Sequence, residues 1–340
     1  MANAYSKSRI RKIVRRFGLI PSRSDSIASL YRKTAIVRVR TKSGIYAMKP
    51  FFRSNLLRSG TIDQIKTTAD YIQHLMNNGF QSMPEWLTSN YGKLWTSDRG
   101  RPFYVTTWIK GRMMENQEDF EKLGRALASL HTTASRSVHI KGPFYNHIRL
   151  WQYKDRLFRR RTAKASHTNR WNRRWYNKFG ESCNQISDRT WTEIKSPEIV
   201  NLLEQEKIRP AFIHSDITSQ NVIIADDGQL FIIDWDRIKL GSIYVEVATV
   251  LMNTTRFNLV FIHALLQGYE QIRPLDRTER KTISCLYRLP REAWFAARFP
   301  ESPRSRNMLD IMEQTWPLRL KAMDLLDEWA NRQEGNDVVK

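Results

Sequence analysis

Cysteine is scarce in this chain, and no long hydrophobic run interrupts it. Two cysteines in 340 residues, Cys183 and Cys285, cannot form a disulfide framework or a cysteine-rich zinc site, so a reducing compartment is the simplest expectation. No segment approaches the roughly 18 apolar residues of a transmembrane helix, and no apolar core follows the basic N-terminus as in a signal peptide. The sequence therefore predicts a cytoplasmic protein without a membrane span.

Acidic residues are also few, and the imbalance is concentrated in one segment. The chain has 34 acidic against 56 basic residues, a formal net charge of +22, which favours an anionic partner. Eleven Lys and Arg between Arg149 and Lys178 face one acid, Asp155, with six aromatic residues among them. They could bind a polyanion or nucleic acid through phosphate contacts and stacking. An amphipathic helical insertion with solvated charges and inward aromatics is favoured over that interpretation.

The patterning divides the chain into a β-rich first part and a helical second part. Residues 35–40 and 45–51 predict a hairpin, a helix follows to about residue 78, and residues 103–108 form a further strand. Helical periodicity dominates from residue 116 onward. We therefore expect an α+β protein with an N-terminal lobe over 1–108, a hinge over 109–115 and a mostly helical lobe over 116–340.

One central stretch, Phe212 to Asp236, carries most of the chemistry. Its last two short apolar runs flank an Asp-Asp-Gly turn, typical of a β-hairpin. This hairpin would bring Asn221 near Asp234, and an amide carbonyl with a carboxylate suits Mg²⁺. Asp216, in the preceding loop, could accept a hydroxyl proton or orient a nucleophile. The stretch predicts a metal-assisted phosphoryl-transfer site.

The combination of polar residues is more informative than any one of them. A single Asp in a loop is usually a turn former, and a single Lys at a strand end is usually a solvated charge. Here His214, Asp216 and Asn221 follow H-x-D-x-x-x-x-N, with Asp234 after a later strand, as in kinases. Lys49 ends the strand Ala-Met-Lys, where kinases place the lysine that grips the nucleotide phosphates.

These motifs, in this order, resemble the aminoglycoside phosphotransferase and choline kinase superfamily. Within it the chain is most similar to the spore coat protein CotS family. Four segments carry the narrower resemblance, which extends over nearly the whole chain: Asn78-Gly79-Phe80 with Met83-Pro84, YVTTWIKGR over 104–112, LGRALASLH over 123–131, and Tyr-Arg-Leu-Pro over 287–290.

The resemblance implies a bilobal protein-kinase-like α+β fold, with a small β-rich N-lobe and a larger, mostly helical C-lobe. It also implies an ATP-dependent phosphotransferase that moves the γ-phosphate of Mg-ATP to a hydroxyl acceptor. Asp216 looks like the catalytic base, Asn221 and Asp234 like Mg²⁺ ligands, and Lys49 like the phosphate-gripping lysine. His214 would order the loop, and Glu246 would brace it from the following helix.

The resemblance also implies where the adenine of the nucleotide binds. It further implies two kinds of partner. The backbone of Trp108, Ile109 and Lys110 would be the hinge against which adenine lies. The acceptor would bear a hydroxyl group, with an anionic acceptor favoured by the basic segment. Spore coat proteins would be partners if the protein assembles into the coat.

Two features depart from the family pattern. The only glycines up to Lys49 are Gly18 and Gly44, so Ser24-Asp25-Ser26 would have to close over the phosphates. No Glu lies between Lys49 and Pro84 to pair with Lys49, which leaves Asp63, Gln64 or Asp70 as substitutes. These departures favour an alternative hypothesis, a kinase-fold structural protein of the spore coat without turnover.

Overall fold

The computed structural model describes residues 5–29, 32–51, 62–135, 143–164 and 170–332. The chain divides into two compact units. The first comprises Met1–Met114 with His214–Lys239, and the second comprises Glu115–Ile213 with Leu240–Lys340. The predicted loop around Asp216 thus belongs to the first unit. The lobe boundaries at residues 109 and 116 remain a prediction.

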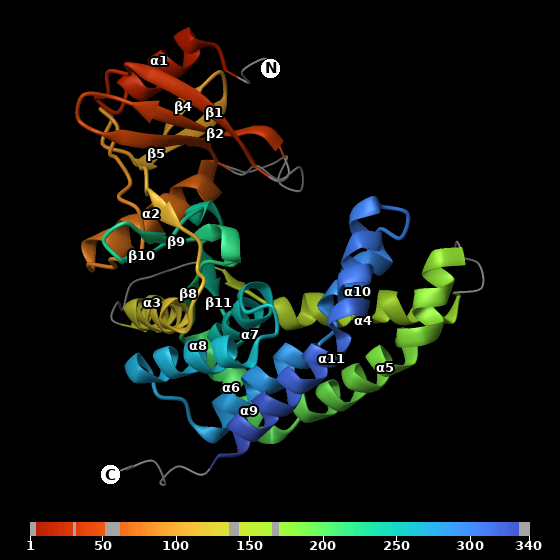
Figure 1. Cartoon of the computed structure of the whole chain (residues 1–340). Coiled ribbons are helices and arrows are strands. Elements are labelled where there is room, and N and C mark those ends of the chain that lie inside the picture. Colours follow the sequence, from red (N-terminus) through yellow and green to blue (C-terminus); the bar gives the residue numbers. More distant parts are fainter. Residues whose placement is uncertain (1–4, 30–31, 52–61, 136–142, 165–169, 333–340) are drawn as a thin grey trace. The chain divides into compact units, whose positions relative to one another are not determined.

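The first unit is built on an antiparallel sheet (Figure 1). The predicted hairpin is present, with Arg40 opposite Ile45 and a turn closed by the Thr41 N–H on the Gly44 carbonyl oxygen at 2.9 Å. The strand order is β1-β2-β3-β5-β4, with β1 (Arg23–Ser29), β2 (Arg32–Arg40), β3 (Ile45–Pro50), β5 (Arg101–Thr107) and β4 (Thr96–Asp98).

Two helices and a second sheet complete this unit. Helix α1 (Lys7–Arg15) buries Ile10 and Ile13 against the first sheet, and α2 (Ile62–Asn77) follows the described part of β3. The second sheet has the order β10-β9-β6, with β10 (Leu230–Ile232), β9 (Val222–Ala225) and β6 (Gly111–Arg112). A Cβ atom at Gly111 would lie 2.0 Å from the Ile224 carbonyl oxygen, so only glycine permits this pairing.

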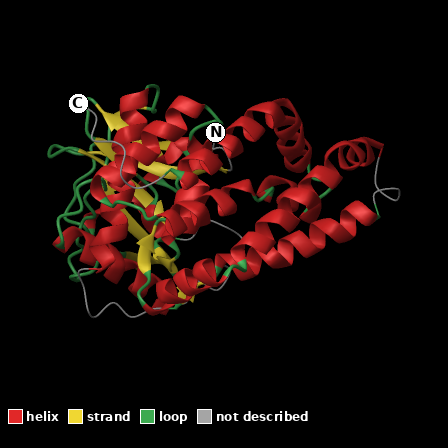
Figure 2. Ribbon diagram, turned by 90° about the horizontal axis from the view of Figure 1, so that it is seen from below, coloured by secondary structure: helices red, strands yellow, loops and turns green. Residues whose placement is uncertain are grey.

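Helices dominate the second unit, and the described chain as a whole has few and short strands (Figure 2). A small sheet of order β7-β11-β8 joins β7 (Phe144–Tyr145), β11 (Lys239–Gly241) and β8 (Ala211–Ile213). The helices are α3 (Gln117–Ser135), α4 (His147–Ala163), α5 (Arg170–Ile194), α6 (Pro197–Ile208), α7 (Ile243–Thr254), α8 (Leu259–Ile272), α9 (Arg277–Arg288), α10 (Arg291–Arg298) and α11 (Pro303–Asn331). None of the described helices is long and apolar enough to cross a membrane.

The basic segment forms most of α4 and the start of α5. Its aromatic side chains largely point inward, since Trp151, Phe158, Trp175 and Tyr176 are buried, whereas Tyr153 is 56% exposed. The side chain of Trp171 lies outside the described residues. The structure therefore confirms the amphipathic insertion, and it leaves little aromatic surface for stacking on nucleotide bases.

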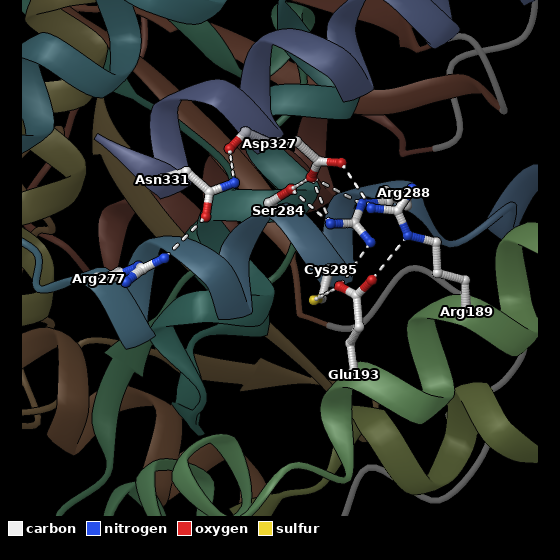
Figure 3. A network of polar contacts seen from close by, with 8 residues as sticks. All are labelled: Arg189, Glu193, Arg277, Ser284, Cys285, Arg288, Asp327 and Asn331. Carbon is white, nitrogen blue, oxygen red and sulfur yellow. Dashed lines mark hydrogen bonds and ion pairs between the residues drawn. The ribbon is translucent and has the colours of Figure 1, made fainter. Parts of the chain in front are cut away.

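A buried ion cluster joins α5, α9 and α11 (Figure 3). The guanidinium of Arg288, 6% exposed, bridges Glu193 at 2.8 Å and Asp327 at 2.5 Å. The thiol of Cys285 also donates to Glu193, at 3.0 Å. Burial raises the pKa of Glu193, but hydrogen bonds from Cys285, Arg288 and Arg189 outweigh it and lower this pKa to about 2. Arg288 therefore compensates the negative charges of Glu193 on α5 and Asp327 on α11.

Replacing Arg288 by Ala should lower the free energy of unfolding by about 3 kcal/mol, because two carboxylates lose their buried cation and keep only the exposed Arg189. Arg277→Ala is the matched control. It lies on the same helix and makes only a 3.5 Å contact with Asn331, so its cost should stay below about 0.5 kcal/mol. Urea denaturation at pH 7 measures both values, and equal costs would contradict the cluster's importance.

The same cluster should make stability depend on pH. The Glu193 pKa is about 2 in the folded protein, below its ordinary value of 4.5. The stabilisation is thus fully present above pH 4.5 and lost as the pH falls toward 2. Stability in Arg288→Ala should fall less steeply across this range.

Candidate active site

His214 fixes the start of the loop that precedes β9. Its Nδ1 accepts the backbone N–H of Asp216 at 3.3 Å, so its Nε2 carries the proton and donates to the Ile233 carbonyl oxygen at 3.1 Å. The ring is fully buried and meets Trp235 edge-on, with 4.6 Å between ring centres. A neutral imidazole thereby ties the loop to the end of the hairpin that carries Asp234.

Asp216 presents a partly exposed carboxylate next to one cation. Its Oδ2 lies 3.7 Å from Arg237 Nη1, and 36% of its side chain is exposed. The preceding residue, Ser215, has a left-handed backbone (φ 67°), a conformation that non-glycine residues adopt mainly where the surroundings impose it. Burial raises the pKa of Asp216, and the Arg237 charge opposes this rise. A raised pKa suits a carboxylate that accepts a proton.

Asn221 and Asp234 are brought together as the hairpin predicted. The Ile233 N–H donates to the Asn221 carbonyl oxygen at 2.8 Å, which places Asn221 beside the residue preceding Asp234. The Asn221 side-chain Nδ2 donates to the Asp216 carbonyl oxygen at 2.7 Å, so its Oδ1 is the atom suited to a cation. Asp234 has a left-handed backbone, φ 74°.

These oxygen atoms fit Mg²⁺, which takes one or two protein ligands and completes its shell with waters and substrate phosphates. The described residues contain no group of three or more His, Cys, Asp or Glu side chains arranged to hold a metal ion. The donor set of Asn221 and Asp234 thus suits a cation delivered with its nucleotide and does not suit a closed structural metal site.

Lys49 has a carboxylate partner that the sequence did not suggest. Its Nζ lies 2.9 Å from Asp234 Oδ1, and its side chain is only 6% exposed. The missing Glu is therefore replaced by the aspartate that follows the hairpin. Asp63, one of the substitutes considered, instead contacts Lys66 at 3.9 Å on the exposed side of α2.

A pocket adjoins this ion pair. Trp86 and Tyr104 form part of its wall as stacked rings, with 4.1 Å between centres and 10° between planes. Trp108 and Ile109 also line it, whereas the Lys110 Nζ pairs with Asp226 at 2.7 Å on the exposed surface. The complete lining is Ile36, Ala47, Lys49, Pro84, Trp86, Tyr104, Thr106, Thr107, Trp108, Ile109, Ile223, Ile233, Asp234 and Trp235. A mostly apolar slot with a cation and a carboxylate can accommodate a planar base and a phosphate chain.

The role suggested for Ser24-Asp25-Ser26, closing over the phosphates, stays a prediction. These residues lie in the middle of β1 and pair one by one with β2, Asp25 opposite Arg38. The Asp25 carboxylate also accepts from Arg23 at 3.1 Å. The connection between β1 and β2 falls at residues 30–31, outside the described residues.

Glu246 takes part in a buried chain of polar groups within the second unit. Its Oε2 lies 3.0 Å from His131 Nε2, and the other nitrogen of that ring lies 2.8 Å from the Tyr269 hydroxyl. Bracing of the Asp216 loop by Glu246 stays a prediction. Sequence reasoning also missed Trp86, Tyr104 and Arg237; for Arg237 the available signal was a basic residue directly after Asp234-Trp-Asp.

Comparison with known proteins identifies relatives over most of the chain. The family model described as the phosphotransferase enzyme family (APH) matches residues 36–318. Homoserine kinase of Agrobacterium fabrum (strain C58 / ATCC 33970) is 26% identical over 227 residues, which cover 64% of this chain and 63% of that protein. The match thus spans less than two thirds of this relative's length.

Solved structures resemble the chain over nearly its whole length. An aminoglycoside phosphotransferase from Alicyclobacillus acidocaldarius subsp. acidocaldarius DSM 446 has a TM-score of 0.79 at 14% identity, covering 97% of each chain. Spectinomycin phosphotransferase APH(9)-Ia, in complex with ADP and spectinomycin, has a TM-score of 0.64 at 16% identity, covering 96% of this chain and 95% of its own. A microcompartment-associated aminopropanol kinase has a TM-score of 0.63 at 14% identity, covering 95% and 97%. These likenesses confirm the protein-kinase-like fold with a β-rich N-terminal and a helical C-terminal region.

Proposed function

We propose that this chain, which belongs to the phosphotransferase enzyme family, is a kinase that moves the γ-phosphate of Mg-ATP to a hydroxyl group of a small molecule. One observation carries the proposal. The Asp216–Asn221 loop meets the residue before Asp234, and the Asp234 carboxylate pairs with Lys49 at 2.9 Å beside a pocket. This arrangement brings Asp216, Asn221, Asp234 and Lys49 into one unit, which supports their proposed roles as base, metal ligands and phosphate-binding cation.

Each residue has a defined part in the proposed reaction. Lys49 would hold the nucleotide phosphates, with Trp108 and Ile109 lining the pocket for adenine. Asn221 and Asp234 would hold Mg²⁺, which when bound supplies positive charge to the transferring phosphoryl group. Asp216 would orient the acceptor hydroxyl and take its proton as the oxygen attacks phosphorus. Catalysis would come mainly from positioning and electrostatic stabilisation.

The names of the relatives support a small acceptor. They are a homoserine kinase, a spectinomycin phosphotransferase and an aminopropanol kinase, and one was crystallised with ADP. These names support both the use of a nucleotide and an acceptor that carries a hydroxyl group.

A screen of metabolite fractions with γ-labelled ATP and Mg²⁺ tests the proposed activity. We expect label to enter at least one small molecule with the wild-type protein and none above background with Asp216→Asn. Equal labelling by both proteins would exclude Asp216 from the transfer. Failure to label any fraction, together with no binding of Mg-ATP, would remove the proposal.

We further propose that the chain is of the CotS type and associates with spore coat proteins. This proposal rests on the sequence segments that resemble that family. One of them, residues 104–112, contributes pocket residues and the strand β6. A fluorescent fusion followed through sporulation should concentrate in the coat layer, and a uniform cytoplasmic signal in mature spores would contradict this assignment.

The hypothesis of a scaffold without turnover rests on two absent features, a Gly-rich loop and a Glu that pairs with Lys49. The Lys49–Asp234 pair supplies a carboxylate for the lysine, which weakens the argument from the absent Glu. The glycine-poor sequence before Lys49 remains in its favour. The labelling screen separates the two hypotheses, because a scaffold would leave every fraction unlabelled while still allowing the protein to bind nucleotide.

A further inference from the structure

Helices α4 and α10 pack against each other (Figure 1). Both carry basic residues near this contact. Lys154 follows Trp151 by three residues on α4, and Arg298 follows Arg291 by seven on α10, so each pair shares one helix face. The Arg291 guanidinium carbon lies 4.7 Å from the centre of the Trp151 ring, which joins the two faces. We call Lys154, Arg291 and Arg298 the cation triad.

The carboxylates next to the triad in sequence serve other partners. Asp155 accepts from Arg159 at 3.0 Å and from the Trp191 indole at 3.0 Å. Glu292 pairs with Arg319 of α11 at 2.9 Å. Consecutive residues of a helix point about 100° apart, which lets these two carboxylates reach their own partners, although the Glu292 charge still acts on Arg291. Within the described part of the chain, no ion pair is formed by any member of the triad.

The hydrogen bonds of Arg291 to the described residues all go to neutral groups, including the Met252 sulfur, which Nη2 contacts at 3.2 Å. Its Nη1 donates to the Thr249 hydroxyl at 2.5 Å and its Nη2 to the Ala248 carbonyl oxygen at 3.3 Å. Its Nε is buried without an acceptor among the described residues. Burial lowers the pKa of Arg291 to about 10, although the nearby Glu292 charge opposes this change. A buried guanidinium N–H without an acceptor is costly, and an anion would satisfy it.

Lys154 is also affected by the positive charges of the other two members of the cation triad. Burial lowers its pKa first, and the charges of Arg298 and Arg291 lower it further. Three cations therefore lie close together at an electrostatic cost, with Arg298 exposed and Lys154 half-buried at the rim. Such a cost is removed when an anion binds among them.

We propose that the cation triad binds the phosphate or carboxylate group of a small anionic ligand. The planar guanidinium of Arg291, braced on Trp151, would fix the orientation of the anion, and Lys154 and Arg298 would add charge from the two helices. Binding of the anion does not depend on the proposed kinase activity.

Titration calorimetry with inorganic phosphate, and separately with acetate, tests the site in the full chain without nucleotide. We expect saturable binding of at least one of the two anions. Lys154→Gln and Arg298→Gln should each weaken it about tenfold, because each removes one charge-assisted contact. Both positions are accessible to solvent, so the variants should fold even if a variant of Arg291 does not.

Two control variants locate the binding. Arg160→Gln removes the same charge from an exposed position of α4 and should change the affinity less than about twofold. Arg156→Gln, at another exposed position of α4, should likewise change the affinity less than about twofold. Unchanged affinity in Lys154→Gln and Arg298→Gln, or no saturable binding of either anion to the wild type, would overturn the proposal. A protein that failed to bind Mg-ATP could still bind an anion at the cation triad. Failure of the proposed kinase activity is therefore distinguishable from failure of the proposed anion site.

Discussion

Asp216→Asn is expected to lower the rate of phosphoryl transfer about a thousandfold, the range typical of a lost general base. The amide keeps the shape of the side chain but cannot accept the hydroxyl proton. Nucleotide binding should persist, because Lys49 and Asp234 are untouched. Turnover with labelled ATP and calorimetric binding of Mg-ATP, measured on the same preparation, check the two halves of this expectation.

The exposed Asp227→Asn is the matched control, since it makes the same change in the turn of the β9–β10 hairpin. It should retain wild-type turnover. A wild-type rate in Asp216→Asn would show that this carboxylate takes no part in transfer. Loss of nucleotide binding in Asp216→Asn would assign Asp216 a structural role. It would contradict the proposal that Asp216 acts on the acceptor while Lys49 and Asp234 bind the nucleotide and its metal.

Asp216→Asn should also raise the stability of the protein at neutral pH. Burial raises the Asp216 pKa above its ordinary value of 3.8. A raised pKa means that the folded state favours the protonated form, and this stabilisation is lost as the pH rises through the folded pKa. At pH 7 the partly buried charge is therefore a cost that the amide removes. Thermal unfolding should show a higher Tm for the variant at pH 7, with the difference shrinking below pH 3.8.

Asp234→Asn is expected to weaken Mg-dependent ATP binding about a hundredfold, because it removes one partner of a buried charge pair together with a metal ligand. Asparagine tolerates the left-handed backbone at this position, φ 74°, better than other substitutes, so the hairpin should survive. Affinity measured with and without Mg²⁺ checks the effect. An affinity for Mg-ATP equal to that of the wild type would exclude Asp234 from the metal site.

The sequence predicts those features of the site that depend on local order. The spacing from His214 to Asn221 and the hairpin before Asp234 are local, and the strand that carries Lys49 follows from a β-type run after a turn. These elements formed where the patterns indicated. That Lys49 and Asp234 meet beside one pocket depends on tertiary packing, which local patterns do not predict.

Other features could not be predicted because their partners are distant in sequence. The Lys49–Asp234 pair joins residues far apart in the chain, and the stacked Trp86 and Tyr104 are brought together only by the fold. A Ser-Asp-Ser run favours a turn, yet residues 24–26 form a strand because β2 supplies a continuous pairing edge. The cation triad likewise depends on the packing of α4 against α10.

Calorimetric titration of ATP into the wild-type protein, in the presence and absence of Mg²⁺, is the decisive test of the proposed nucleotide site. We predict saturable binding of one ATP per chain that strengthens when Mg²⁺ is present. Binding should weaken in Lys49→Gln, which removes the cation of the Lys49–Asp234 pair. No saturable binding to the wild type under either condition would contradict the assignment of this pocket to Mg-ATP.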